Sequence, residues 1–249
     1  MTPTAVVVGG ASGIGLATAR VLAAEGFSVV VADVNSDAAL AAAEEIGGRA
    51  VTLDVTDESS VAAGFASVDE LEAVVSCAGL TVPGALTELG LDQWQTSIDV
   101  CLTGSFLVLK HAGQRMVDGG SITVISSLNG RQPGAGMGAY CAAKAGVTML
   151  VEVAALELAP RKIRVNAISP GLVDTPLTEG LALVPGLVDE YLENTPLGRS
   201  GRPEEVADMA AYLASEKAAW ITGSAFDLNG GAHLQRYPDV LGKIRALSS

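Results

Sequence analysis

The chain has 249 residues, 49% hydrophobic and 17% charged, which is enough for one large α/β core. Its net charge of −13 argues against nucleic acid or an anionic membrane surface as partner. Three cysteines without repeated spacing and no Cys/His cluster predict neither a disulfide framework nor a metal site. We expect a cytoplasmic protein, because no basic leader opens the chain and no apolar run reaches the roughly 18 residues that span a bilayer.

The N-terminal region has the pattern of a strand, a glycine turn and a helix. An apolar run at 4–8 precedes the turn, and an alanine-rich helix pattern at 16–24 follows it. Glycines permit a tight turn, and free backbone N–H groups at a helix start bind a pyrophosphate. The context therefore predicts a dinucleotide-binding turn. Its residues are Gly9, Ser12, Gly13, Ile14 and Gly15.

A second apolar run, at 28–32, ends at Asp33. A carboxylate at the end of this strand is expected to bind the 2′-hydroxyl of the adenosine ribose. A 2′-phosphate there would meet a like charge, and neither Ser12 nor Val34 and Asn35 offers a compensating base. The prediction is therefore NAD rather than NADP.

The rest of the chain alternates between apolar strands and helices, which predicts a doubly wound parallel sheet with helices on both faces, one domain over 1–249. The expected strands are 49–54, 72–76, 121–126, 163–168 and 224–228; the expected helices are 36–46, 57–66, 91–117, 137–159 and 203–214.

Two segments interrupt this alternation. The segment 172–199 is mostly apolar and follows a strand end, where a substrate lid is expected. The tail, 232–249, has a pattern that leaves two alternatives open: it covers a neighbouring subunit or it is loose.

A candidate catalytic group lies in the middle of the chain. Tyr140 and Lys144 are one turn apart on a predicted helix, and Ser127 directly follows the strand at 121–126. A nearby ammonium favours the phenolate, so Tyr140 is expected to exchange the proton of a substrate hydroxyl while Ser127 holds its oxygen. A Tyr–Lys pair at this spacing is also common on helix surfaces, so the prediction depends on the N-terminal site.

Together these stretches resemble the short-chain dehydrogenase/reductase family over nearly the full chain. The 13-residue gap before Tyr140 selects Ser127 over Ser126, because this gap is usual in the family. The matching motifs are the glycine turn, Asp33, Asp54-Val55, Cys77-Ala78-Gly79, Ser127, Tyr140 to Lys144, Asn166 and Pro170 to Thr175.

The resemblance implies a seven-stranded Rossmann-type sheet, NAD or NADP as hydride carrier, and a dimer or tetramer formed through the helices at 91–117 and 137–159. It makes Tyr140 the acid/base, with Ser127 orienting the substrate; Lys144 binds the nicotinamide ribose and lowers the tyrosine pKa. Further cofactor contacts are implied for Asp54, Val55, Cys77, Ala78, Gly79, Gly171, Val173 and Thr175.

Three positions depart from the family pattern. Val8 and Cys77 replace a threonine and an asparagine that contact each other, which suggests a repacked strand junction. Cys101 replaces an asparagine that supports a water beside Lys144. A thiol is a weak donor and acceptor, so slower proton exchange is one interpretation and simple packing of a small buried side chain is the other.

We expect oxidation or reduction between a secondary alcohol and a ketone, on a hydrophobic or alicyclic substrate of hydroxysteroid or terpenoid type. The alternatives are a 3-oxoacyl thioester reductase on the same scaffold and a nucleotide-binding sensor or scaffold with little turnover. The expected pocket residues are Leu80, Val82, Leu128, Met137, Leu172 and 176–191.

Overall fold

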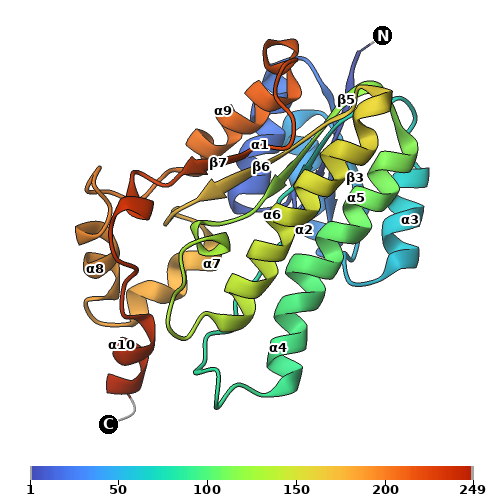
Figure 1. Cartoon of the computed structure of the whole chain (residues 1–249). Coiled ribbons are helices and arrows are strands. Elements are labelled where there is room, and N and C mark those ends of the chain that lie inside the picture. Colours follow the sequence, from blue (N-terminus) through green and yellow to red (C-terminus); the bar gives the residue numbers. More distant parts are fainter. Residues whose placement is uncertain (1, 248–249) are drawn as a thin grey trace.

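The computed structural model describes residues 2–247, which contain one parallel sheet of seven strands (Figure 1). Its strands are β1 (Thr4–Val8), β2 (Ser28–Asp33), β3 (Arg49–Thr52), β4 (Leu71–Ser76), β5 (Met116–Ile125), β6 (Arg164–Pro170) and β7 (Ala225–Leu228). Their order is β3-β2-β1-β4-β5-β6-β7, and every neighbouring pair is parallel. The predicted doubly wound fold is thus confirmed. Its order reverses between β1 and β4, where such sheets bind ligands beyond the carboxyl ends of the strands.

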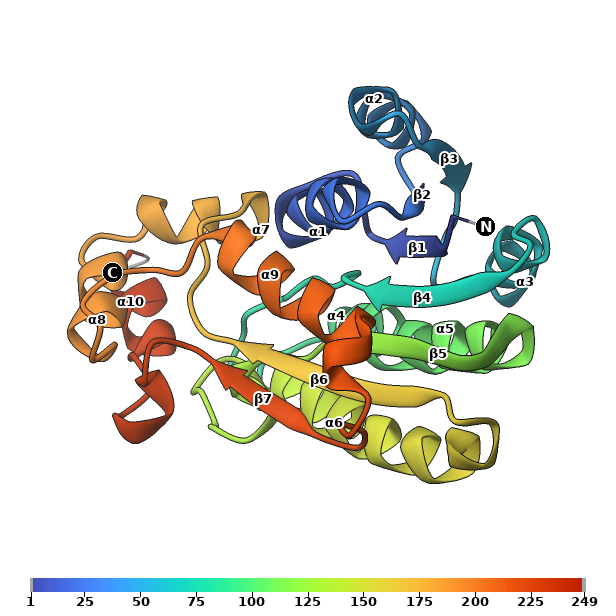
Figure 2. The same ribbon diagram turned by 90° about the horizontal axis from the view of Figure 1, so that it is seen from above.

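Helices cover both faces of the sheet (Figure 2). They are α1 (Gly13–Ala24), α2 (Ser36–Ile46), α3 (Glu58–Ala66), α4 (Leu91–Ile98), α5 (Gly104–Arg115), α6 (Gly138–Leu158), α7 (Pro176–Glu179), α8 (Leu187–Glu193), α9 (Pro203–Ala214) and α10 (Val240–Ala246).

Alternation along the strands divides the core into two layers, because successive side chains point to opposite faces. On β1, Val6 and Val8 pack in the cluster that includes residues of α3, α5 and α6. The neighbouring Ala5 and Val7 pack in the second cluster, with residues of α1, α2 and α9. Both faces are buried, which explains why the strands read as continuous apolar runs.

The prediction of one continuous helix at 91–117 is wrong. Asp99–Thr103 forms a π-helical segment between α4 and α5, and Cys101 lies within this wider turn. The helix ends at Arg115, so β5 begins at Met116 rather than at 121. Hydrophobic periodicity does not reveal one extra residue per turn, which is why the sequence pattern missed the π-helical segment.

The strand expected at 49–54 also ends early, at Thr52. Asp54 instead forms a turn, because its Oδ1 accepts hydrogen bonds from the backbone N–H and the hydroxyl of Thr56, at 2.9 and 2.7 Å. An aspartate that binds the backbone two residues on favours a turn over a strand.

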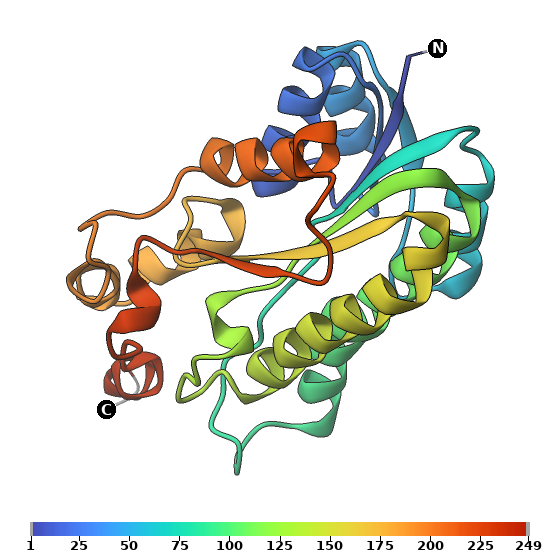
Figure 3. The ribbon, with the colours of Figure 1, turned by 45° about the horizontal axis from the view of Figure 1, so that its top comes forward.

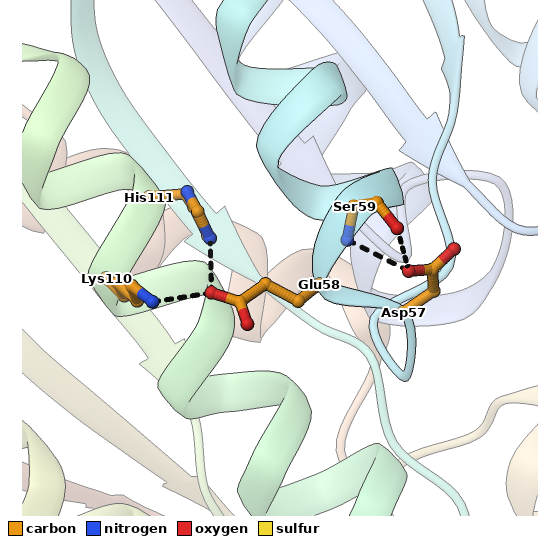
Figure 4. A network of polar contacts seen from close by, with 5 residues as sticks. All are labelled: Asp57, Glu58, Ser59, Lys110 and His111. Carbon is orange, nitrogen blue, oxygen red and sulfur yellow. Dashed lines mark hydrogen bonds and ion pairs between the residues drawn. The ribbon is translucent and has the colours of Figure 1, made fainter.

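An ion-pair cluster connects α3 to α5 on the surface (Figure 4). Glu58 Oε1 is 2.5 Å from Lys110 Nζ and 3.3 Å from His111 Nε2. The hydrogen bond from Lys110 is the main cause that lowers the pKa of Glu58. Because the Glu58 side chain is 54% exposed, we expect this cluster to orient the two helices more than it stabilises them.

Helix α6 is the longest helix among the described residues, and it carries Tyr140 and Lys144. With the turn that follows, Gly138–Arg161 is long and apolar enough to span a bilayer by length and composition alone. It is not an uninterrupted apolar run, because Lys144, Glu152 and Glu157 lie within it. In the fold, α6 covers the sheet, because Val147 and Val151 pack in the same cluster as Val165 of β6.

The lid segment and the tail lie together beyond the carboxyl ends of β6 and β7 (Figure 3). The lid, 172–199, contains α7 and α8, and the tail contains α10. Residues 232–247 are not loose, because this part folds back on its own chain; 248 and 249 lie outside the described residues. Val240 packs with Leu187 of α8 and with Met137, the residue before α6.

Asn166 joins β6 to the turn before β7, and it is fully buried. Its Nδ2 donates to the carbonyl of Ile221 at 3.0 Å, and its Oδ1 accepts from the backbone N–H of Ser224 at 3.1 Å. We predict that Asn166→Ala lowers the free energy of unfolding by about 1–3 kcal/mol, because both backbone groups lose their partner. Urea denaturation measures this loss.

The control is Asn35→Ala, which removes the exposed N-cap of α2, where Asn35 Oδ1 accepts from Ala38 N at 3.1 Å. That change is expected to cost about 1 kcal/mol or less. Equal stability of the wild type and the Asn166→Ala protein would contradict the prediction.

Candidate active site

Two adjoining hollows lie at the carboxyl edge of the sheet, and we name them the groove and the cavity. The groove runs past the ends of β1 to β4, and the cavity lies between β5, β6, the lid and the tail. Ile14, Cys77, Gly79, Thr175 and Leu177 line both. The predicted cofactor residues all line one of them: Gly9, Ser12, Gly13, Ile14, Gly15, Asp33, Asp54, Val55, Cys77, Ala78, Gly79 and Thr175 line the groove, and Tyr140, Lys144, Gly171 and Val173 line the cavity.

The glycine turn is shaped by steric limits. Gly9 and Gly13 have φ of +70° and +50°, in the left-handed region that favours glycine. A Cβ on Gly15 would overlap the carbonyl oxygen of Gly9. Ser12 occupies the N-cap position of α1, but its side chain makes no capping hydrogen bond. Backbone N–H groups at this helix start are therefore suited to bind an anion.

Asp33 is held at the end of β2, beside the glycine turn. Its Oδ2 accepts from the backbone N–H of Ala11 at 3.1 Å, and its Oδ1 accepts from that of Asn35 at 3.0 Å. The two bonds fix the carboxylate at the groove, at the position expected for a group that binds a ribose.

Ser127, Tyr140 and Lys144 meet in the cavity, although Ser127 comes from the turn after β5 and the other two from α6. Lys144 is 2% exposed, and its Nζ donates to the carbonyl of Ile125 at 2.7 Å. The same Nζ lies 5.6 Å from the centre of the Tyr140 ring. The predicted constellation is therefore assembled with the ammonium next to the phenol.

The electrostatics differ from the expected lowering of the tyrosine pKa. Burial raises the pKa of Tyr140, and a hydrogen bond with the Ser127 side chain acts in the opposite direction. Burial also lowers the pKa of Lys144. The protein's own groups thus favour a neutral phenol, and a further positive charge in the cavity would lower its pKa.

Cys101 fixes the loop between the groove and the cavity. It is fully buried; its Sγ donates to the carbonyl of Leu80 at 3.2 Å and accepts from the N–H of the same residue at 3.5 Å. At the other departure from the family pattern, the backbone N–H of Cys77 donates to the carbonyl of Val8 at 2.8 Å. Burial raises the pKa of the Cys77 thiol to about 12, so it is neutral.

The cavity wall agrees only in part with the apolar wall expected from the sequence. Leu128, Met137 and Leu172 line the cavity, together with Leu177, Leu181 and Tyr191 of the lid. Leu80 lines the groove instead, and Val82 lines neither hollow. The sequence analysis missed Asn129, Gln132, Asn194, Thr195, Ala232, Arg236, Tyr237 and Pro238. Asn129 and Gln132 closely follow Ser127, which is a usable signal, but no local pattern identifies the tail residues.

A chain of hydrogen bonds closes the cavity on the tail side. Tyr237 OH donates to Asn129 Oδ1 at 3.1 Å, and it lies 2.8 Å from Tyr191 OH. Because the Tyr237 proton is used by Asn129, the hydroxyl of Tyr191 is the donor between the two tyrosines. Gln132 Nε2 also donates to the carbonyl of Gln235, at 2.5 Å. Lid, tail and the turn after β5 are thereby joined.

Glu190 of α8 anchors the tail, and its side chain is 10% exposed. Its Oε1 accepts from Arg236 Nη1 at 2.6 Å and from the N–H of Asp239 at 3.2 Å, and Lys243 Nζ lies 3.8 Å from its Oε2. The hydrogen bond from Arg236 is the main cause that lowers the pKa of Glu190. A carboxylate with a lowered pKa stabilises the fold above its unfolded pKa, and this stability is lost as the pH falls through the folded value.

We therefore predict that the wild type is more thermally stable than Glu190→Gln at pH 7. The difference should persist down to about pH 4.5, near the ordinary glutamate pKa, and shrink at lower pH as Glu190 protonates. Thermal unfolding midpoints between pH 3 and 8 measure it. Glu193→Gln, an exposed change on the same helix, is the control; a Glu190→Gln effect that is constant over this range would contradict the prediction.

Comparisons with known proteins place the chain among oxidoreductases. The family model described as "Enoyl-(Acyl carrier protein) reductase" matches residues 9–233. A cis-4-hydroxycyclohexanecarboxylate dehydrogenase of Sinomonas cyclohexanicum is 44% identical over 239 residues, which are 91% of this chain and 95% of that protein. A 2,5-dichloro-2,5-cyclohexadiene-1,4-diol dehydrogenase of Sphingobium indicum is 38% identical, over 91% of this chain and 94% of its own.

A solved structure extends the likeness to three dimensions. A short-chain type dehydrogenase/reductase from Mycobacterium ulcerans superposes with a TM-score of 0.94 at 35% identity, over 98% of this chain and 94% of that one. The chain belongs to the short-chain dehydrogenase/reductase family and is an oxidoreductase.

Proposed function

We propose that this protein is an NAD-dependent dehydrogenase that interconverts an alicyclic secondary alcohol and its ketone. One observation carries the proposal: the cavity that holds Ser127, Tyr140 and Lys144 adjoins the dinucleotide groove through shared wall residues. A substrate carbon in the cavity is thus next to the place where a nicotinamide would lie. This arrangement suits hydride transfer.

Three residues of the cavity have different roles in the proposed reaction. The Ser127 hydroxyl, whose Oγ accepts from the N–H of Asn129 at 3.2 Å, is held where it can bind the substrate oxygen. Tyr140 takes the hydroxyl proton at its phenolic oxygen during oxidation and returns it during reduction. Lys144, held by Ile125, places a positive charge beside the Tyr140 ring. NAD⁺, when bound, supplies the hydride acceptor and a second positive charge.

The choice of NAD follows from Asp33. Its carboxylate lines the groove, and its two backbone hydrogen bonds leave it no freedom to turn away from a ribose. A 2′-phosphate would approach this fixed charge. Two unit charges about 4 Å apart repel by about 4 kcal/mol in a partly solvated site.

A single-ring substrate fits the cavity better than a steroid. The cavity encloses about 160 Å³, below the roughly 300–1,000 Å³ of sites for drug-sized ligands. Both sequence relatives named above act, by their names, on six-membered rings that bear hydroxyl groups. The thioester reductase is the second candidate, because the matching family model is described as an enoyl-(acyl carrier protein) reductase, whose substrate is likewise a thioester on a carrier protein. The net charge of −13 disfavours an acidic carrier protein.

We also propose a homo-oligomer in the cytoplasm. Phe106 of α5 and Met149, Val153 and Leu156 of α6 are large apolar side chains that are 41–78% exposed. These helices lie side by side on one face of the molecule (Figure 1), and such an apolar surface is typical of a subunit interface. The three cysteines are free thiols, which fits a reducing compartment.

The first test concerns Tyr140. With NAD⁺ and a panel of cyclohexanols, we predict that Tyr140→Phe lowers the turnover rate by about 10²- to 10⁴-fold, because the proton acceptor is lost. Absorbance of the reduced nicotinamide measures the rate, and NADH fluorescence should show retained binding. Tyr212→Phe, a half-exposed change on α9, is the control. Wild-type protein that binds NADH but turns over no alcohol or ketone would favour a sensor or scaffold.

The second test concerns cofactor choice. We predict that the wild type prefers NAD over NADP by at least about tenfold in kcat/KM, and that Asp33→Ser reduces or reverses this preference because the repulsion is removed. Asp37→Ser in the first turn of α2 is the matched control, since it removes the same charge outside the groove. A wild type that prefers NADP would refute the role of Asp33.

A further inference from the structure

The charges that line the cavity are unusual for so acidic a chain. The sequence has 28 acidic and 15 basic residues, yet no Asp or Glu is among the described residues of the cavity wall. Lys144 and Arg236 are the two charged side chains of that wall, and both are cations. An anion would be repelled by the molecule as a whole, whereas this cavity would attract it.

We propose that Arg236 binds a carboxylate on the substrate, so that the substrate class is an alicyclic hydroxy acid. This inference rests on the proposed dehydrogenase function and adds a specificity residue to it. The hydroxyl end of the substrate lies at Ser127 and Tyr140, and the carboxylate end lies at the tail.

Lys144 is not available for this task. Its side chain is buried, its Nζ donates to Ile125, and it faces the Tyr140 ring. Arg236 has a different environment, because its side chain is 63% exposed. Within residues 2–247 its hydrogen bond to Glu190 uses Nη1 alone, whereas a guanidinium has five N–H donors. The remaining donors form a planar fork that matches a carboxylate.

Glu190 holds Arg236 from outside the cavity wall. Glu190 does not line the cavity, and it is shared between Arg236 at 2.6 Å and Lys243 at 3.8 Å. The ion pair also limits the freedom of the arginine, which reduces the entropy lost when a ligand binds.

The rest of the wall favours a carboxylic acid of compact shape. Leu128, Met137 and Leu172 supply apolar contacts between the catalytic residues and the tail. A phosphate of a thioester carrier is the other anion that an arginine could bind. The cavity volume of about 160 Å³ favours a carboxylate attached directly to a ring.

The experiment compares an acid with its neutral analogue in binding and in turnover. Titration calorimetry on the full chain with NAD⁺ measures the affinity for cyclohexanecarboxylate and for cyclohexanecarboxamide, neither of which bears a reacting hydroxyl. Steady-state rates are then measured for 4-hydroxycyclohexanecarboxylate, 4-methylcyclohexanol and 3-hydroxybutyryl-CoA. The proteins are the wild type, Arg236→Met, Arg236→Lys and Lys243→Met.

We expect Arg236→Met to weaken carboxylate binding by about 10- to 100-fold, with a similar loss of kcat/KM for the hydroxy acid that appears mainly in KM. The carboxamide and 4-methylcyclohexanol should change by less than about threefold. Arg236→Lys should retain part of the carboxylate affinity that Arg236→Met loses. A lysine keeps the positive charge but lacks the planar fork of N–H donors. Lys243→Met removes a cation from Glu190 outside the cavity wall, so it should leave the selectivity for the acid unchanged.

Other outcomes separate the two proposals. Equal losses for the acid and its neutral analogue would mean that Arg236 only holds the tail, and unchanged carboxylate affinity in Arg236→Met would overturn the inference directly. If Arg236 affected the rate with 3-hydroxybutyryl-CoA alone, the carboxylate proposal would be wrong, and Arg236 would instead bind a phosphate of the thioester carrier. Absence of turnover with every alcohol, together with Arg236-dependent carboxylate binding, would refute the dehydrogenase and leave the carboxylate site standing.

Discussion

The hydrogen bond from the buried Lys144 ammonium to the carbonyl of Ile125 is the constraint on which the site depends. It connects α6 to the last residue of β5, so it places the helix that carries Tyr140 against the strand end that carries Ser127. A lysine with 2% exposure is costly to bury unless it is paired. The carbonyl on one side and the tyrosine ring on the other supply that pairing and keep a positive charge at the reacting centre.

Under the proposed function, the groove binds the cofactor and the cavity binds the substrate. The groove is built from elements that lie early in the chain, and its form follows from steric and backbone requirements at Gly9, Gly13 and Gly15. The cavity is built from the strand end after β5, the lid and the tail, and its form follows from side chains. Under the proposed function, the chemistry belongs to Ser127, Tyr140 and Lys144 in the cavity, and the choice of substrate belongs to the lid and the tail.

The tail makes the cavity more polar than the sequence analysis predicted. A purely hydrophobic wall would suit a terpenoid or a steroid, but Asn129, Tyr237 and Arg236 make one side of the cavity polar. The same residues hold the tail in place, since Tyr237 binds Asn129 and Arg236 binds Glu190. Under the proposal for Arg236, closure of the cavity and recognition of the substrate therefore depend on one set of hydrogen bonds.

The sequence by itself determined the sheet, the glycine turn and the positions of Ser127, Tyr140 and Lys144, because these features depend on periodicity, on backbone freedom and on spacing within single elements. The exact ends of the helices and strands were predicted less well. The π-helical segment at Cys101 and the early end of β3 depend on local hydrogen bonds, which hydrophobic periodicity does not reveal. Only the tertiary structure decided that the tail closes its own cavity. The contact between Arg236 and Glu190 joins residues 46 apart in the chain, and such a pairing is set by packing of the whole fold.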